Sequence, residues 1–278
     1  MIIERFAVGG VRIAKHGYEA SECEDEFVWY TAKNASGRTA PISVAVSDGA
    51  SESMLAKDWA RLLVTRFGYE AFTESTILDP RSDRYSMTLA SLKNEWVALH
   101  LADYLRAREA SFRPIKWYEQ PKLDAGASAT LLVFRLERGT DHSACRWRAV
   151  AVGDSCLFQV RGGEIIASFP IDEPTKFGRA PDLLRSRGLE IVQDQPCFAG
   201  GSYTVGDEFF FMTDAIAKWF MRASTSRSTD DFAREVRNLS TMCCANDASS
   251  LSVWTRALQS AGQMHNDDIA CAYVGVIG

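Results

Sequence analysis

The segment VAVSDGASES, residues 44–53, begins as an apolar strand-type run and stops at an Asp-Gly pair. β-Branched residues before Asp48 predict a buried strand, and the Asp-Gly pair predicts that the chain leaves the sheet there. A lone aspartate at a strand end is usually a turn residue or a helix N-cap. The same relationship recurs, however, at four other acids: Asp25, Asp154, Asp214 and Asp267. Five acids in this relationship favour a shared functional role.

The pattern of apolar residues predicts runs of strands and runs of helices. Strands are expected at Glu26–Ala32, Ile42–Ser47, Ala129–Glu137, Arg146–Val152, Ser155–Val160, Glu164–Ser168, Glu208–Thr213 and Ile269–Ile277. Helices are expected at Ser53–Phe67, Thr88–Glu109, Ala215–Met221, Asp230–Leu239 and Ala248–Ala261. Turns are expected at Lys33–Thr39 and Arg161-Gly162-Gly163, and an irregular stretch at Phe169–Gly206. Hairpin links instead of βαβ crossovers predict an α+β fold, with helices layered outside two stacked antiparallel sheets.

Composition limits the classes of protein that the chain can belong to. Its 278 residues are 46% hydrophobic and contain no repeat or long linker, so we expect one domain over 1–278. The net charge of -5 gives no broad attraction for nucleic acid. No apolar run reaches membrane-spanning length, and the first residues lack a signal-peptide pattern, which predicts a cytoplasmic protein without a membrane partner. The seven cysteines form no CxxC pair, so a zinc or redox motif is not expected.

Carboxylates gathered at one edge of a sandwich repel each other, so cations or raised pKa values must balance them. Hard divalent ions such as Mg²⁺ and Mn²⁺ prefer oxygen ligands. A pair of these ions can clamp a phosphoryl group and activate a water molecule. The acids therefore predict a phosphatase that needs no protein nucleophile.

Six ordered motifs resemble those of the metal-dependent type 2C (PPM-like) serine/threonine protein phosphatases, in particular their divergent bacterial branch. The motifs span nearly the whole chain: ECEDEF at 22–27, VAVSDGASES at 44–53, GASATLLVF at 126–134, AVAVGDSCLFQV at 149–160, FFFMTDAIAKWF at 209–220 and HNDDIACAYV at 265–274. The resemblance implies a four-layer α-β-β-α sandwich, with residues 169–206 as a variable flap. It also implies hydrolysis of phosphoserine or phosphothreonine on a signalling protein, opposed by a serine/threonine kinase.

The resemblance also implies a role for each acid. Asp48 would bridge two Mn²⁺ or Mg²⁺ ions, and the Gly49 carbonyl would bind one of them. Asp25, which follows the family's glutamate at Glu24, would serve the first ion or its waters. The other ion would be held by Asp214 and by Asp267, the first acid of the final pair, while Asp154 would serve a third, weaker ion. We therefore expect Asp48, Asp25 and Asp214 to act catalytically through an activated water or hydroxide, and His265 to assist proton transfer.

The sequence departs from the family pattern at the position of the phosphate-binding arginine, which is Ala20 here. Replacement cations are sought among Arg12, Lys15, Lys176, Arg179 and Arg185. Ser51 and Ser53 are expected to cap the following helix. The loss of the arginine leaves a second interpretation open, a pseudophosphatase that acts as a regulatory binding module. A serine hydrolase and an ATPase are disfavoured, because GxSxG and GxxxxGK[ST] motifs are absent.

Overall fold

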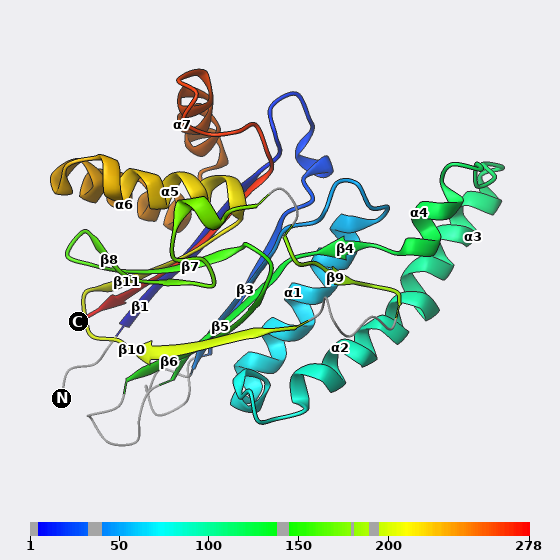
Figure 1. The fold of residues 1–278 in the computed structure, drawn as a ribbon, viewed down its shortest axis with the longest axis horizontal. Helices are drawn as coiled ribbons and strands as arrows, with labels where there is room; N and C mark the ends of the chain where they lie inside the picture. Colours follow the sequence, from blue (N-terminus) through cyan, green and yellow to red (C-terminus); the bar gives the residue numbers. More distant parts are fainter. Residues whose placement is uncertain (1–4, 33–40, 138–144, 179–180, 189–194) are drawn as a thin grey trace.

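The computed structural model describes residues 5–32, 41–137, 145–178, 181–188 and 195–278, and its strands form two stacked antiparallel sheets (Figure 1). One sheet has the order β1 (Arg5–Ile13), β12 (Ile269–Ile277), β11 (Asp207–Met212), β7 (Cys156–Arg161) and β8 (Glu164–Phe169). The other has the order β10 (Cys197–Ser202), β6 (Arg146–Val152), β5 (Leu131–Glu137), β3 (Ile42–Ser47) and β2 (Glu26–Tyr30). A two-stranded ribbon joins β4 (Ser128–Ala129) to β9 (Leu184–Arg185).

An apolar core fills the space between the two sheets. Alternate residues of each strand point inward, as expected for stacked sheets. Phe134 of β5 meets Phe209 and Phe211 of β11, with ring centroids 5.1 and 4.8 Å apart. These three side chains are fully buried, so they fix the two sheets against each other.

Helices cover the outer face of each sheet (Figure 1). On the β2–β3–β5 side, Trp59 of α1 (Ala56–Thr73) packs edge-to-face on Trp96, with centroids 5.5 Å apart. On the other side, Phe220 of α5 (Asp214–Ser226) packs on Phe158 and Phe210 of the sheet beneath it. The same layer contains α6 (Thr229–Ala245) and α7 (Ala248–Ser260). The remaining helical elements are η1 (Ala20–Glu22), η2 (Ser75–Leu78), α2 (Arg84–Glu95), the π-helical η3 (Trp96–Leu101), α3 (Ala102–Ala110), α4 (Gln120–Ala125) and η4 (Pro174–Lys176).

The α+β sandwich predicted from the sequence is confirmed. Gly162 and Gly163 form the predicted turn between β7 and β8, and both have positive φ, 59° and 84°. The prediction of an irregular stretch over 169–206 is wrong in part, because β10 lies in it and forms the edge of a central sheet. β1 was not predicted either. The turn predicted at Lys33–Thr39 lies outside the described residues. No helix in the described ranges is long and apolar enough to span a membrane.

Candidate metal centre

The strand register brings all five acid-bearing strand ends to one edge of the sandwich. The start of β2 pairs with the end of β3, so Asp25 and Asp48 leave the sheet side by side. In the other sheet, the end of β11 pairs with the first residue of β7 and with the early part of β12. Asp214 follows β11, whereas Asp154 and Asp267 precede β7 and β12. Antiparallel pairing therefore gathers acids that are far apart in the sequence.

A cleft of ≈ 720 Å³ opens at this edge, and four of the acids line it: Asp48, Asp154, Asp214 and Asp267. Its other lining residues come from the loop after Asp48, from β4, and from the segment around β9. Asp25 lies deeper, with only 2% of its surface exposed. The cleft is therefore lined by carboxylates and by polar loop residues.

Thr130 fixes the backbone of Asp48. The Asp48 amide donates to Thr130 Oγ1 at 2.9 Å, and the Thr130 amide donates to the Asp48 carbonyl at 2.9 Å. Ser47 Oγ also donates to the Thr130 carbonyl, at 2.5 Å. Burial raises the pKa of the Asp48 carboxyl well above its ordinary value, and Asp25 and the other acids raise it further. Asp48 is thus held rigidly where a negative charge is unfavourable.

Only glycine fits at position 49. A Cβ there would lie 2.9 Å from the Glu24 carbonyl oxygen and 3.1 Å from the backbone of Ala56. The close approach packs the Asp48-Gly49 turn against the segment that carries Asp25. The Asp-Gly pair therefore has a packing reason in addition to any role of the Gly49 carbonyl.

Two of the buried carboxylates have an oxygen without a partner. Among the described residues, neither Asp25 Oδ2 nor Asp154 Oδ1 has a hydrogen-bond partner. Burial raises the pKa of Asp25 well above its ordinary value; a hydrogen bond with Thr213 opposes this shift, and neighbouring acids add to it. Burial, followed by the charge of Asp214, raises the pKa of Asp154 from 3.8 to about 7. An unpartnered buried carboxylate oxygen is unfavourable, and a bound cation would remove this penalty.

The negative charge of Asp267 affects the ionisation of Asp214. Burial and then the charge of Asp267 raise the pKa of Asp214, while the Ala215 amide at the start of α5 lowers it. Burial also raises the pKa of Asp267. Both residues line the cleft.

Asp268 has a different role from Asp267. Its carboxylate accepts hydrogen bonds from the backbone amides of Lys15 at 2.8 Å and Glu24 at 2.7 Å, and it is 5% exposed. It thereby ties three chain segments together beneath the cleft. Because both of its oxygens are occupied by backbone donors, Asp267 is the acid of this pair that remains available to a ligand.

Two lysines, Lys15 and Lys218, act electrostatically on the acids of the cleft. Lys15 Nζ lies 3.3 Å from Ser51 Oγ, and its charge lowers the pKa of Asp267 against the larger effect of burial. Lys218 stands four residues after Asp214 on α5, and its charge favours the ionised forms of Asp214 and Asp154. That i, i+4 spacing was visible in the sequence and could have identified Lys218 as a neighbour of the site.

Of the other replacement cations, Arg12 is engaged elsewhere, because it pairs with Glu26 and donates to the Asp25 carbonyl at 3.1 Å. Lys176 pairs with Asp172 at 2.5 Å. Arg185 lines the acidic cleft, and Arg179 lies outside the described residues.

Three further sequence predictions concern the loops at the cleft. His265 is exposed, and its charge favours the ionised forms of Asp214 and Asp267. The prediction that Ser51 and Ser53 cap α1 is wrong, because Leu55 is the N-cap residue, in a left-handed conformation with φ 64°. Ser51 instead hydrogen-bonds to Glu24, and Ser53 Oγ accepts from the Ser128 amide at 3.0 Å. Both serines hold the loop after Asp48 in place.

The donor set fits hard divalent cations. The acids supply oxygen ligands only, two of their buried oxygens lack partners, and their pKa values are raised by crowding and burial. Across the part of the chain that the structure describes, no three His, Cys, Asp or Glu side chains are already arranged as a ligand set. Binding of a cation would therefore require the carboxylates to move together.

Sequence comparisons find no matching family model and no significant match among curated proteins. Solved structures do match. The chain aligns over 98% of its length with 99% of the photosystem II phosphatase PBCP, at 15% identity and a TM-score of 0.54. It aligns over 100% of both chains with the Mycobacterium tuberculosis serine/threonine phosphatase PstP/Ppp, at 13% identity and a TM-score of 0.53.

A third similar structure is the catalytic domain of PstP in complex with two manganese ions, at 14% identity and a TM-score of 0.53, covering 99% of each chain. At these identities the likeness establishes the fold. The chain has the fold of the type 2C protein phosphatases, and the resemblance seen in its six motifs is confirmed at that level.

Proposed function

We propose that this chain is a metal-dependent phosphatase that hydrolyses phosphoserine or phosphothreonine on a protein. The observation that carries the proposal is the convergence of acids from five strand ends at one edge of the sandwich, where four of them line the cleft, with two buried carboxylate oxygens unpartnered among the described residues. The similarity to serine/threonine phosphatases supports the class of substrate. A cytoplasmic location, a bacterial source and an opposing serine/threonine kinase are parts of the same proposal.

Asp25, Asp48, Asp214 and Asp267, with the Gly49 carbonyl, would hold two Mn²⁺ or Mg²⁺ ions, and Asp154 would serve a third. Such ions polarise a phosphoryl group and lower the pKa of a coordinated water. The chain itself supplies the rigid frame: the Thr130 hydrogen bonds fix Asp48, and Asp268 fixes the backbone of Lys15 and Glu24. Once the ions are bound, a rigid backbone frame would keep the charges in place during the reaction.

Lys15 and Arg185 are the best-placed cations to bind the substrate phosphate. Arg185 lines the cleft, and the Lys15 ammonium contacts Ser51, which also lines it. Each can donate to phosphate oxygens, and Lys15 would do so as a compact charge. His265, near Asp214 and Asp267, would transfer a proton to the leaving alkoxide. Lys15 and Arg185 would together replace the phosphate-binding arginine, whose position is occupied here by Ala20.

The decisive experiment measures hydrolysis of an aryl phosphate and of phosphothreonine peptides while manganese is titrated. Wild-type protein should require manganese, and Asp48→Asn should reduce the rate by a factor of about 100 or more, as expected for loss of a central electrostatic group. Asp230→Asn is the matched control, because Asp230 is exposed on α6 and does not line the acidic cleft. Its rate should stay within about twofold of wild type.

The same titration separates the enzyme from a pseudophosphatase. Manganese binding can be followed independently as a rise in melting temperature, because a ligand that binds only the folded state stabilises it. Stabilisation by manganese without turnover of any substrate would favour the binding module. Turnover that is equal in wild type and Asp48→Asn would refute the assignment of the site.

A further inference from the structure

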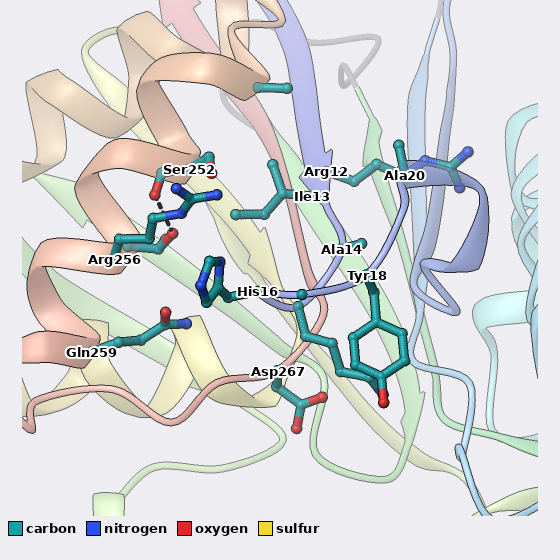
Figure 2. Close-up of a pocket in the computed structure, with 14 residues that line it drawn as sticks. Arg12, Ile13, Ala14, His16, Tyr18, Ala20, Ser252, Arg256, Gln259 and Asp267 are labelled. Atoms are coloured by element: carbon teal, nitrogen blue, oxygen red, sulfur yellow. Dashed lines mark hydrogen bonds between the residues drawn. The ribbon is translucent and has the colours of Figure 1, made fainter.

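A second, smaller pocket adjoins the acidic cleft, and basic residues outnumber acidic ones in its lining. It has a volume of ≈ 200 Å³ and lies between the loop after β1 and helix α7 (Figure 2). Asp267 lines both the pocket and the cleft, so the two cavities are neighbours at this residue. Apart from Asp267, its charged lining residues are cations: Arg12, which is already paired with Glu26, and Lys15 and Arg256. His16 lines it as well.

Each side of the pocket carries a side-chain donor that has no partner among the described residues. Figure 2 shows His16 on the loop opposite Arg256 and Gln259 of α7. Among the residues that the structure describes, the Arg256 guanidinium and the His16 imidazole make no hydrogen bond or ion pair. Arg256 is exposed on a well-formed helix, so its charge is available to a ligand without breaking an internal contact.

The loop side of the pocket is held in place by the residues before β12. The Asn266 side chain accepts from the His16 amide at 2.7 Å and donates to the His16 carbonyl at 3.2 Å. Asp268 accepts from the Lys15 amide at 2.8 Å. The pocket therefore has a fixed wall, and an anion entering it would need little ordering of the protein.

We infer that this basic pocket receives an anionic side chain flanking the phosphorylated residue of a protein substrate. The inference rests on the proposed function, because the adjoining acidic cleft must be the place where the phosphorylated residue binds. Asp267 lines both the cleft and the pocket, so a substrate chain that passes this residue would reach the pocket lined by Arg256 and His16. A carboxylate or a second phosphate there gains charge-assisted hydrogen bonds, whereas a basic side chain is repelled. The pocket thus confers a preference for acidic or doubly phosphorylated segments.

The test compares phosphothreonine peptides whose flanking residues are neutral, glutamate, phosphoserine or lysine, with the flank placed on either side. Wild type should hydrolyse the best glutamate or phosphoserine peptide with a kcat/KM about fivefold above the neutral peptide, the effect of one partly exposed charged contact. High ionic strength should reduce this ratio. The glutamate and phosphoserine peptides distinguish the two sources of negative charge.

Arg256→Gln should abolish the preference and leave hydrolysis of the neutral peptide and of an aryl phosphate unchanged. Arg222→Gln is the control, because Arg222 is an exposed helical arginine that does not line the pocket. Binding of non-hydrolysable phosphonate analogues of the same peptides to manganese-loaded protein, followed by fluorescence anisotropy, gives a readout that does not need turnover. The expected change in affinity on Arg256→Gln is again about fivefold and limited to the anionic peptides.

The outcomes separate this inference from the proposed function. Aryl phosphate hydrolysis without any flank preference would overturn the inference and leave the proposed function standing. Absence of hydrolysis would refute the proposed function, and the anisotropy measurement would then decide on the pocket. Equal affinities of wild type and Arg256→Gln for the anionic analogues would overturn the inference in either case.

Discussion

Substitution of Asp154 by asparagine should stabilise the metal-free protein, and the gain should grow with pH. Asp154 is 5% exposed, and burial and Asp214 raise its pKa from 3.8 to about 7. A carboxyl whose pKa is raised on folding favours the folded state below its unfolded pKa, and that contribution is lost as the pH rises through the folded pKa. Ionised Asp154 therefore opposes folding at pH 8.

The size of the effect follows from the shift in pKa. A shift of about three units at 1.36 kcal/mol each destabilises the folded state by about 4 kcal/mol at pH 8. Burying the amide of asparagine costs about 1 kcal/mol, which leaves a net gain of about 3 kcal/mol. At pH 5 most of this gain is absent, because folded Asp154 is then mostly protonated. The difference between Asp154→Asn and wild type should thus increase by about 2 to 3 kcal/mol from pH 5 to pH 8.

Urea unfolding with a metal chelator at the two pH values measures this difference directly. Asp230→Asn, at an exposed position on α6, should show no comparable dependence on pH. A stability difference between Asp154→Asn and wild type that is constant with pH, or that favours wild type at pH 8, would refute the electrostatic description of the cleft.

Two further predictions concern substrate binding and the frame of the sandwich. Lys15→Met should raise KM for phosphopeptides by about five- to tenfold with little change in kcat, and Lys15→Arg should restore most of the lost affinity. Steady-state kinetics measure both constants. A loss only in kcat would contradict the phosphate-binding role of Lys15. Although burial favours its neutral form, hydrogen bonds from Arg161, Thr204 and Gln159 lower the pKa of Asp207. Asp207→Ala should therefore lower the free energy of unfolding by about 2 to 3 kcal/mol at neutral pH, with the loss shrinking as acid protonates wild-type Asp207; an equal loss at all pH values would contradict this account.

Periodicity predicted most of the sandwich, and the two strands that it missed in the five-stranded sheets, β1 and β10, contain paired glycines. In β1, a Cβ at Gly9 would lie 2.4 Å from the Cys243 carbonyl oxygen. In β10, a Cβ at Gly201 would lie 2.7 Å from Trp147 Nε1. These glycines weaken the strand pattern in the sequence, but packing against a neighbouring helix and a tryptophan requires them. Local propensity could not reveal such long-range contacts.

The position of the candidate site could be predicted from the sequence, because the ends of neighbouring strands lie along one edge of a sheet. Aspartates at strand ends point to a common edge once the strands pair antiparallel, and the register brings Asp25 and Asp48 together. The hydrogen bonds of Asp268 to two distant backbone amides depend on tertiary structure and have no signal in the sequence. The same is true of Arg12, whose ion pair with Glu26 removes it from the set of free cations.

Anomalous diffraction from crystals grown or soaked in manganese can show whether the acids hold a pair of ions. We expect two manganese peaks in the cleft lined by Asp48, Asp214 and Asp267, with Asp25 turned toward them, and no such peaks in crystals of Asp48→Asn. Density that shows these side chains apart and facing solvent, without an ion between them, would contradict this expectation.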